Sequence, residues 1–287
     1  MHYSTKYSFQ SVANLQEEQF YKLFVYVYKS GLSYALVNKN TLSVDKLEEF
    51  QLAEASSETM LIQHLSQLCA DIEVLRNKLW HEIIVYFHTE NFTFIPLSLY
   101  DEEQKNEYFG TNFTINFEKE LILSSVIKSN QIVTLFTISN HLSSFFNELF
   151  AGRSITFIPY INSLVENFAF QKQANEVNFY MYLVDNQLSV VVINKEKHLL
   201  YGNQFFVQSN NDILYYILLV AEELAIDNEQ LELSLYGYFT SPLALINLLK
   251  TYIGKVSWGV PNYNFKIEHF PAEIPNYRHI VLYNSSI

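Results

Sequence analysis

The strongest constraint on the fold of this chain is an internal repeat. The segment from Tyr26 to Lys39 matches the segment from Tyr182 to Lys195, at an offset of 156 residues. Five aligned pairs are identical: Tyr26/Tyr182, Leu32/Leu188, Ser33/Ser189, Asn38/Asn194 and Lys39/Lys195. Each copy has β-branched and aromatic residues on both sides of a short polar turn, which is the pattern of a β-hairpin. The repeat therefore predicts one supersecondary unit that is used twice.

The elements expected after each hairpin follow the same order in both copies. A third strand comes first, and apolar residues at spacings of three and four then indicate a helix. A short buried strand completes each copy. The expected ranges are strand 47–52, helix 62–79 and strand 82–87 in the first copy, and strand 203–208, helix 213–224 and strand 231–236 in the second. The order β-β-β-α-β, which is the core of a ribonuclease-H-like unit, is thus expected twice.

The remainder of each copy is less alike. The second copy should contain a helix that begins at Ser241 and Pro242 and stops at Gly254, and Asn210 or Asn211 should cap its earlier helix. The polar stretch Gln171–Glu176 marks the expected boundary, which divides the chain into domains 1–172 and 173–287. Further elements are expected as helices at 97–109, 140–150 and 160–170 and as strands at 132–137, at 154–158, near 265 and at 279–283.

Composition and charge exclude several classes of function. The net charge is −12 and no run of Lys and Arg occurs, which argues against binding to nucleic acid or to anionic lipid. The single cysteine, Cys69, cannot form an internal disulfide and has no partners for a metal site. The longest apolar stretch, 213–221, is much shorter than the roughly 20 residues of a membrane span. The amino terminus has no apolar core of a signal peptide, so we expect a cytoplasmic protein without membrane insertion.

Four segments carry a resemblance to a known family: 91–96, 132–138 with the following 141–146, 199–205 and 212–224. The chain resembles an uncharacterised bacterial family, a domain of unknown function, whose members are described as having an actin-like ATPase fold. The likeness extends from about Tyr21 to Ile253. It implies an α/β fold class, with two duplicated ribonuclease-H-like domains in an actin-like ATPase arrangement and a ligand cleft between them. A more distant likeness is to the actin-like protein of type IV pilus assembly, a cytoplasmic scaffold for membrane partners.

The resemblance directs attention to two hairpin turns that grip phosphates in actin-like ATPases. There, a glycine lets backbone N–H groups approach the phosphates, and aspartates hold Mg²⁺ and orient the attacking water. The first turn of this chain offers Lys29, Ser30 and Gly31, without a carboxylate. The second offers Asp185 without a glycine. Asp185 is either a surviving metal-side acid or a residue that the turn geometry favours, and Gly31 has the same two interpretations.

A third element of such ATPases is a pair of glycines that faces the adenosine. In this chain it is reduced to Gly237, and Tyr238 stands where the second glycine would be. The tyrosine either fills the space that a base would need or stacks on the base. No acid lies inside the two hairpin strands as a ribonuclease-H-type nuclease requires, and neither a zinc-binding histidine spacing nor a phosphate-binding glycine loop occurs.

The sequence leaves three hypotheses. The first is a non-catalytic pseudo-ATPase that acts as a protein-interaction module, with an unidentified protein partner, no cofactor, no metal site and no catalytic residue. The alternative is a weak nucleotide binder or slow ATPase that holds ATP and Mg²⁺ in a degenerate cleft built from six residues: Lys29, Ser30, Gly31, Asp185, Gly237 and Tyr238. The third is a duplicated fold kept for dimerisation alone.

Overall fold

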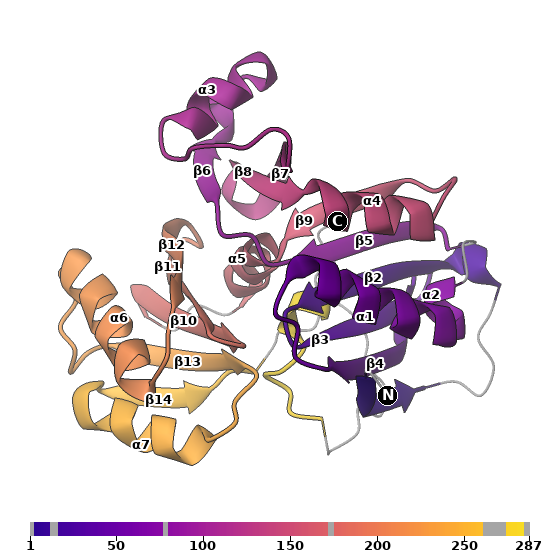
Figure 1. Cartoon of the computed structure of the whole chain (residues 1–287). Coiled ribbons are helices and arrows are strands. Elements are labelled where there is room, and N and C mark those ends of the chain that lie inside the picture. Colours follow the sequence, from indigo (N-terminus) through magenta and orange to yellow (C-terminus); the bar gives the residue numbers. More distant parts are fainter. Residues whose placement is uncertain (1–2, 12–16, 77–79, 172–174, 261–273, 284–287) are drawn as a thin grey trace. The chain divides into compact units, whose positions relative to one another are not determined.

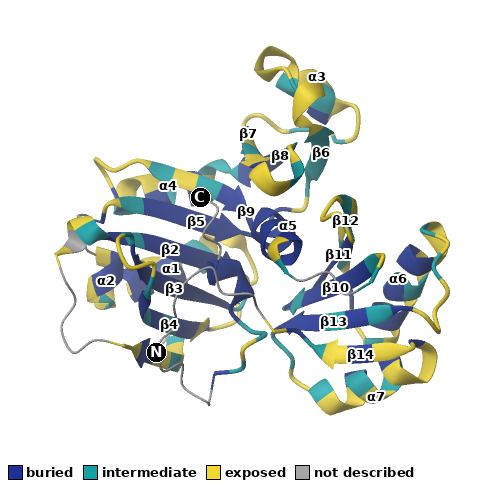
Figure 2. Ribbon diagram, turned by 180° about the vertical axis from the view of Figure 1, so that it is seen from behind, coloured by how far each residue is buried: buried dark blue, intermediate teal, exposed yellow. Residues whose placement is uncertain are grey.

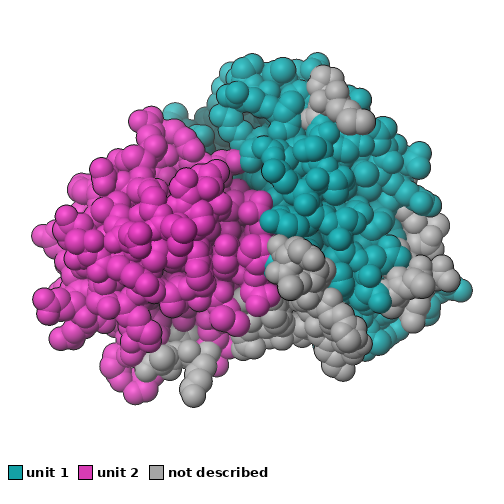
Figure 3. Space-filling view, turned by 90° about the horizontal axis from the view of Figure 1, so that it is seen from below, with its two compact units in different colours: residues 1–162, 263–274, 287 teal, residues 163–262, 275–286 magenta. Residues whose placement is uncertain are grey.

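The computed structural model describes residues 3–11, 17–76, 80–171, 175–260 and 274–283. They form two compact units (Figure 3). Unit 1 comprises residues 1–162, 263–274 and 287, and unit 2 comprises residues 163–262 and 275–286. The sequence boundary was expected after residue 172, whereas unit 2 begins at Ser163, inside the helix α5 (Tyr160–Phe170).

Unit 1 contains a six-stranded sheet in the order β1-β4-β3-β2-β5-β9 (Figure 1). The first predicted hairpin is present as β2 and β3, which pair antiparallel so that Tyr28 faces Gly31 across the turn. Parallel pairing then joins β2 to β5 and β5 to β9. The strands are β1 (Tyr3–Gln10), β2 (Tyr21–Tyr28), β3 (Gly31–Asn38), β4 (Val44–Leu52), β5 (Glu82–Phe87) and β9 (Ile155–Pro159).

Both faces of this sheet are buried, so its central strands are nearly continuous runs of apolar residues (Figure 2). On one face, alternate residues of β2 pack in a common core with α1 (Glu58–Asp71) and α4 (Asn140–Leu149). On the other face, Tyr26 makes an edge contact with Tyr160 at the start of α5, with ring centroids 5.7 Å apart. Cys69 lies in the first core, where burial raises the pKa of its thiol to about 12.

The helix expected over 62–79 is shorter than predicted. α1 starts earlier, because the side chain of Ser57 accepts a hydrogen bond from the Met60 N–H, and it ends at Asp71. Ile72 is extended, and a separate turn of helix, α2, covers Glu73–Arg76. The apolar stripe therefore continues through a break in the helix, which periodicity alone does not reveal. Residues 77–79 lie outside the described part of the chain.

A small module in unit 1 joins β5 to β9. Its sheet has the order β6-β8-β7 and packs on α3 (Lys105–Gly110) around a core of its own that includes Phe109, Ile122 and Val133. The strands are β6 (Phe92–Pro96), β7 (Glu120–Ile127) and β8 (Ile132–Ser139). The strand β8 was predicted, and β7 was not. Polar and apolar residues do not alternate along β7, whose sequence is ELILSSVI, so the period-2 signal of a strand is missing.

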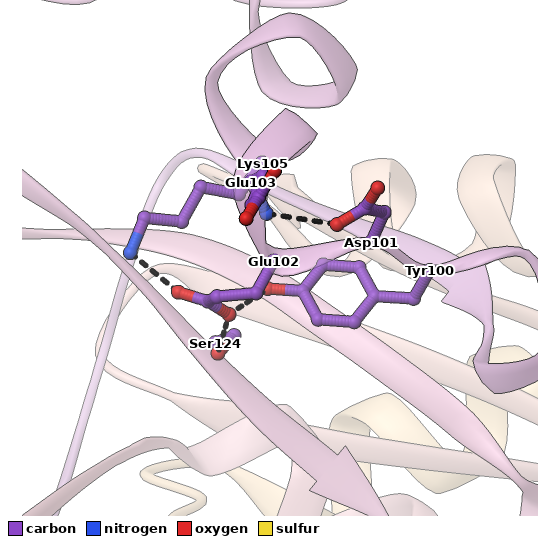
Figure 4. A network of polar contacts seen from close by, with 6 residues as sticks. All are labelled: Tyr100, Asp101, Glu102, Glu103, Lys105 and Ser124. Carbon is purple, nitrogen blue, oxygen red and sulfur yellow. Dashed lines mark hydrogen bonds and ion pairs between the residues drawn. The ribbon is translucent and has the colours of Figure 1, made fainter.

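The helix predicted over 97–109 is replaced by two short 3₁₀ turns, 97–99 and 102–104, followed by α3. Local polar contacts favour these turns (Figure 4). The Asp101 carboxylate accepts a hydrogen bond from the Glu103 N–H at 3.0 Å, and the Glu102 carboxylate accepts one from Lys105 Nζ at 2.6 Å. The hydroxyls of Tyr100 and Ser124 also donate to Glu102. Side-chain bonds of this kind compete with a continuous helix.

Unit 2 repeats the strand order of unit 1. Its sheet runs β12-β11-β10-β13-β14, with the same succession of antiparallel and parallel pairs as β4-β3-β2-β5-β9. The predicted duplication is therefore confirmed at the level of topology. The elements are β10 (Val177–Val184), β11 (Gln187–Asn194), β12 (Leu199–Phe206), α6 (Asn210–Glu223), β13 (Glu232–Gly237), α7 (Pro242–Tyr252) and β14 (Lys255–Trp258).

The ends of the two helices in unit 2 differ from expectation. Ser209, rather than Asn210 or Asn211, caps α6, because Ser209 and Asp212 exchange side-chain and backbone hydrogen bonds as a capping box. α7 starts at Pro242 as predicted, but Gly254 does not take the left-handed conformation. A Cβ at Gly254 would lie 1.9 Å from the Glu229 carbonyl oxygen, so the glycine is needed for a close backbone approach.

The end of the chain also differs from expectation. The strand expected at 279–283 is a 3₁₀ helix, Ile280–Tyr283, whose carbonyls accept hydrogen bonds from the side chains of Ser163 and Asn167 on α5. This tertiary pairing occupies the backbone groups that a strand would use. The strand expected near residue 265 lies outside the described residues, and β1 and β14 were not predicted.

Candidate functional site

In the first predicted phosphate-gripping turn, the space beside the glycine is filled by neighbouring residues. Lys29 and Ser30 form the two-residue turn between β2 and β3, and Gly31 begins β3. A Cβ at Gly31 would lie 2.5 Å from the carbonyl oxygen of Phe50 and 2.6 Å from the end of the Tyr28 ring. The Ser30 carbonyl accepts a hydrogen bond from the Leu52 N–H at 2.9 Å. The space beside Gly31 is therefore taken by Tyr28 and by the backbone of β4.

The second turn has the geometry of a tight hairpin. Asp185 and Asn186 connect β10 to β11, and Asp185 has a φ of 52°. Asp and Asn tolerate this left-handed region better than most residues do, because their short polar side chains bond locally. The Asn186 carbonyl accepts a hydrogen bond from the Val207 N–H at 2.8 Å. Hairpin geometry alone accounts for an aspartate at this position.

The glycine at the end of β13, the fourth strand of unit 2, allows a close approach to β10. Gly237 has a φ of 112°, and a Cβ there would lie 2.1 Å from the Leu183 carbonyl oxygen. Its N–H donates a hydrogen bond to the Tyr277 carbonyl at 3.0 Å, and the Tyr238 N–H donates to the Leu183 carbonyl at 2.7 Å. Both backbone donors at the end of β13 are therefore already paired within unit 2.

The Tyr238 side chain is enclosed by the C-terminal segment of the same unit. The guanidinium carbon of Arg278 lies 4.1 Å from the centroid of the Tyr238 ring, which is a cation–π arrangement. The Tyr238 hydroxyl is 3.3 Å from Nδ1 of His279, and the ring also makes edge contacts with Tyr182 and His279. Tyr238 thus has a packing role in this unit that needs no bound base.

The predicted site residues fall into two sets. Lys29, Ser30 and Gly31 lie together at one turn of unit 1, whereas the other three lie at the ends of the adjacent strands β10 and β13 of unit 2: Asp185, Gly237 and Tyr238. Within the described ranges, no group of three or more His, Cys, Asp and Glu side chains is placed to hold a metal ion.

Unit 1 also contains a pocket of about 330 Å³, and Lys29 is the one residue of its lining that sequence reasoning had proposed for a site. It lies where β2 and β5 end side by side, next to the start of α1 and the junction of β8 with α4. The carboxyl ends of parallel strands commonly border ligand sites, so the segment 88–91 after β5 was the available signal. The lining residues are Val27, Tyr28, Lys29, Glu58, Leu61, Phe87, His88, Thr89, Glu90, Asn91, Glu120, Thr137, Ile138, Ser139 and Leu142.

Acids outnumber bases around this pocket. Glu58, Glu90 and Glu120 belong to its lining, against the single cation Lys29. The Ser139 hydroxyl donates a hydrogen bond to the Glu58 carboxylate, and His141 Nδ1 lies 3.5 Å from the same carboxylate. The pocket therefore combines apolar walls with an acidic border, which favours a cationic occupant over an anionic one.

His88 is the unusual polar residue of the pocket. Both of its ring nitrogens are shielded from solvent and have no hydrogen-bond partner among the described residues. Its ring packs against Tyr160 with centroids 5.9 Å apart. Burial lowers the pKa of His88 to about 4, so the imidazole is neutral at pH 7. A neutral imidazole whose two nitrogens are shielded from solvent cannot supply the positive charge that a phosphate group would need here.

Comparison with known proteins identifies the family. A family described as "Protein of unknown function (DUF3822)" matches residues 10–256. The chain belongs to this family. No curated protein matches the chain. In addition, the structure of this DUF3822 member contains no described helix that is long and apolar enough to cross a membrane.

Two solved structures show the fold of this DUF3822 protein. A Bacteroides thetaiotaomicron protein, described as having an actin-like ATPase fold and unknown function, is 24% identical with a TM-score of 0.73, and the match covers 83% of this chain and 90% of that chain. A chain of the PilM–PilN type IV pilus biogenesis complex is 12% identical with a TM-score of 0.56, over 86% and 90% of the two chains. The actin-like ATPase fold with duplicated ribonuclease-H-like domains, expected from the sequence, is thereby confirmed.

Proposed function

We propose that this protein is a non-catalytic member of the actin-like ATPase fold that acts as an interaction module for another protein. One observation carries the proposal: at two predicted nucleotide positions, Gly31 and Gly237, the space beside the glycine is occupied by other atoms of the protein. The Tyr28 ring and the Phe50 carbonyl occupy the space at Gly31, and the Leu183 backbone occupies it at Gly237. An ATPase of this fold would need that space for phosphates and adenosine.

The electrostatics point in the same direction. Phosphoryl transfer depends on cations and backbone N–H groups that neutralise the charge that develops on the transferred phosphoryl group. At Gly237 the N–H is bonded to Tyr277, and around the pocket of unit 1 the acids outnumber the single lysine. Both features disfavour a bound triphosphate.

A protein partner is the favoured kind of ligand. A protein whose fold resembles this one, PilM, has been solved as a complex with PilN. We extend only the kind of role to this chain, an actin-like body that binds another protein, and we place it in the cytoplasm. The partner could instead be a second copy of this chain. Light scattering of the purified protein distinguishes a dimer from a monomer.

A nucleotide assay tests the proposal. Purified protein is incubated with ATP and Mg²⁺, and phosphate release is measured beside a thermal-shift series with ATP, ADP and GTP at millimolar concentration. We expect no turnover and no shift. A ligand present at ~100 times its Kd would stabilise the protein by about 2.7 kcal/mol, which is easily detected.

The alternative hypothesis predicts the opposite outcome of that assay. A weak nucleotide binder or slow ATPase would use Lys29 as a point charge on phosphate and Asp185 on the metal side. Turnover that depends on Mg²⁺ and is lost in both Lys29→Ala and Asp185→Ala would replace our proposal by this one. Lys250→Ala, a change of an exposed lysine on α7, is the matched control for the loss of charge.

A further inference from the structure

The walls of the unit 1 pocket are part of the main hydrophobic core. Val27, Phe87, Ile138 and Leu142 are at most 9% exposed, and all four belong to the cluster that holds α1 and α4 on the sheet. Leu61, on α1, is half-buried and packs on the same cluster. The pocket thus opens onto core side chains, and an apolar group placed in it would exchange contact with water for contact with them.

The size of the pocket limits its occupant. Pockets for small molecules and cofactors usually have volumes of about 300–1,000 Å³, and the pocket of unit 1, at about 330 Å³, lies at the small end. It has room for one or two side chains together with the backbone that carries them. Such a volume suits the anchoring residues of a peptide segment better than a whole dinucleotide or lipid.

The negative charge of the glutamates at the border of the pocket favours basic peptide segments over acidic ones. Glu58 and Glu90 are exposed and Glu120 is half-buried, so all three carboxylates are close enough to solvent to meet a partner without a large desolvation cost. The whole chain carries a net charge of −12, so the long-range field also attracts cations. An acidic or phosphorylated segment would be repelled at the same border.

We infer that this pocket binds a segment of a partner protein in which a bulky apolar side chain is flanked by Lys or Arg. The apolar side chain enters between Leu61, Phe87 and Leu142, and the basic groups pair with the three glutamates at the border. The assignment rests on the proposed function, because it names the chemistry of the partner that the interaction module recognises.

Labelled peptides test the assignment by fluorescence anisotropy. The first probe is a fluorescein-labelled peptide, Lys-Lys-Leu-Phe-Lys-Lys, and two matched probes replace either every Lys by Glu or the Leu-Phe pair by Ser-Ser. We expect the native protein to bind the first probe at least about fivefold more tightly than either of the others, because charge pairing and apolar burial each contribute about 1 kcal/mol or more. Binding should weaken as salt is added, since salt screens the border charges.

Variants of the protein test whether the peptide binds at the pocket of unit 1. The triple change Glu58→Gln, Glu90→Gln and Glu120→Gln removes the border charge, and its control changes three exposed acids outside the pocket, Glu54→Gln, Glu73→Gln and Glu118→Gln. We expect the first triple variant to weaken binding by at least about fivefold and the control to leave it within twofold.

A second pair of variants tests the apolar part of the pocket. Leu61→Trp places a larger side chain inside it, whereas Met60→Trp makes the same kind of change at the neighbouring exposed position, outside the pocket. We expect only Leu61→Trp to abolish binding, and circular dichroism of both proteins checks that they are folded. If Leu61→Trp does not fold, the glutamate variants still decide the question.

Three outcomes would overturn the assignment: no binding of the basic apolar probe at millimolar concentration, equal binding of the acidic probe, or equal effects of the pocket variants and their controls. ATP turnover is measured on the same preparation. Failure of the peptide assay without turnover overturns only the pocket assignment, whereas turnover overturns the proposed function.

Discussion

The ring of Tyr28 lies directly across the hairpin from Gly31 and covers the face where a Cβ would project, 2.6 Å from that position. The tyrosine ring and the carbonyl of Phe50 thus fill the space into which a side chain at this position would project. Packing requires a glycine at position 31, because neither this ring nor the backbone of β4 leaves room for a side chain. The relationship gives the glycine a structural role that a stability measurement can test.

Gly31→Ala should lower the free energy of unfolding by about 1–3 kcal/mol, since a methyl group would meet the Phe50 carbonyl oxygen at 2.5 Å and neither strand can withdraw without loss of pairing. Urea denaturation measures the change. Gly110→Ala is the control, because a Cβ there has nothing within 4 Å, and its effect should be neutral or slightly stabilising. Equal costs at both positions would contradict this account.

Gly237→Ala should be the more severe change and should cost more than about 3 kcal/mol, because it combines a positive φ with overlap on the Leu183 backbone. Gly152→Ala separates the two causes. Gly152 also has a positive φ, of 84°, but open space around it, so the conformational strain alone should cost about 1 kcal/mol. Thermal denaturation of the two variants compares them. If both changes cost the same, the overlap with β10 is not what fixes Gly237.

The capping box of α6 gives a test of a position that sequence alone misplaced. Ser209→Ala removes the side-chain acceptor for the Asp212 N–H and should cost about 1 kcal/mol. Asn210→Ala, at the position where the sequence suggested a cap, should have little effect, because Asn210 is already inside the helix. A larger loss in Asn210→Ala than in Ser209→Ala, measured by urea denaturation, would contradict the assignment of the cap.

His88 should make the stability of the protein depend on pH. Its folded-state pKa is lowered to about 4 from 6.5, so the unfolded chain binds the proton more tightly than the folded chain does. The contribution of the neutral His88 side chain to the free energy of unfolding is therefore fully present above about pH 6.5. It is lost as the pH falls towards about 4, and the loss is at most about 3 kcal/mol.

His88→Phe isolates this contribution. The phenyl ring keeps the contact with Tyr160 and removes two buried nitrogens that lack hydrogen bonds, so the variant should be more stable at pH 7 by about 1–3 kcal/mol. Its advantage over the native protein should grow further between pH 6.5 and pH 4.5. Urea denaturation at several pH values measures both effects, and parallel pH profiles of the two proteins would refute the burial of a neutral imidazole.

Much of the fold was predictable because local and tertiary preferences agree along most of the chain. The two hairpins, the buried strand β5 and the helix α4 have apolar patterns of the right length and period, and the structure contains all of them. The errors lie where tertiary contacts override local preference. The segment 279–283 has the composition of a strand, yet its carbonyls are bound by Ser163 and Asn167 from α5.

The candidate site was less predictable. The six residues suggested by resemblance were chosen by position along the chain, and the roles of their glycines became visible only when Phe50 and Leu183, which are distant in sequence, were found against Gly31 and Gly237. The pocket of unit 1 gathers residues from 27 to 142, and no local pattern connects Glu58 with Glu90 and Glu120.

The sequence by itself determined the duplication, the order β-β-β-α-β of each copy and the acidic charge, because periodicity, repeat and composition are properties of the chain as written. Only the tertiary structure decided which glycines have other residues packed against them, as Gly31 and Gly237 do, and where the pocket of unit 1 lies. Both depend on which distant side chains and carbonyls come within a few ångströms of one another, and packing of whole elements sets those distances.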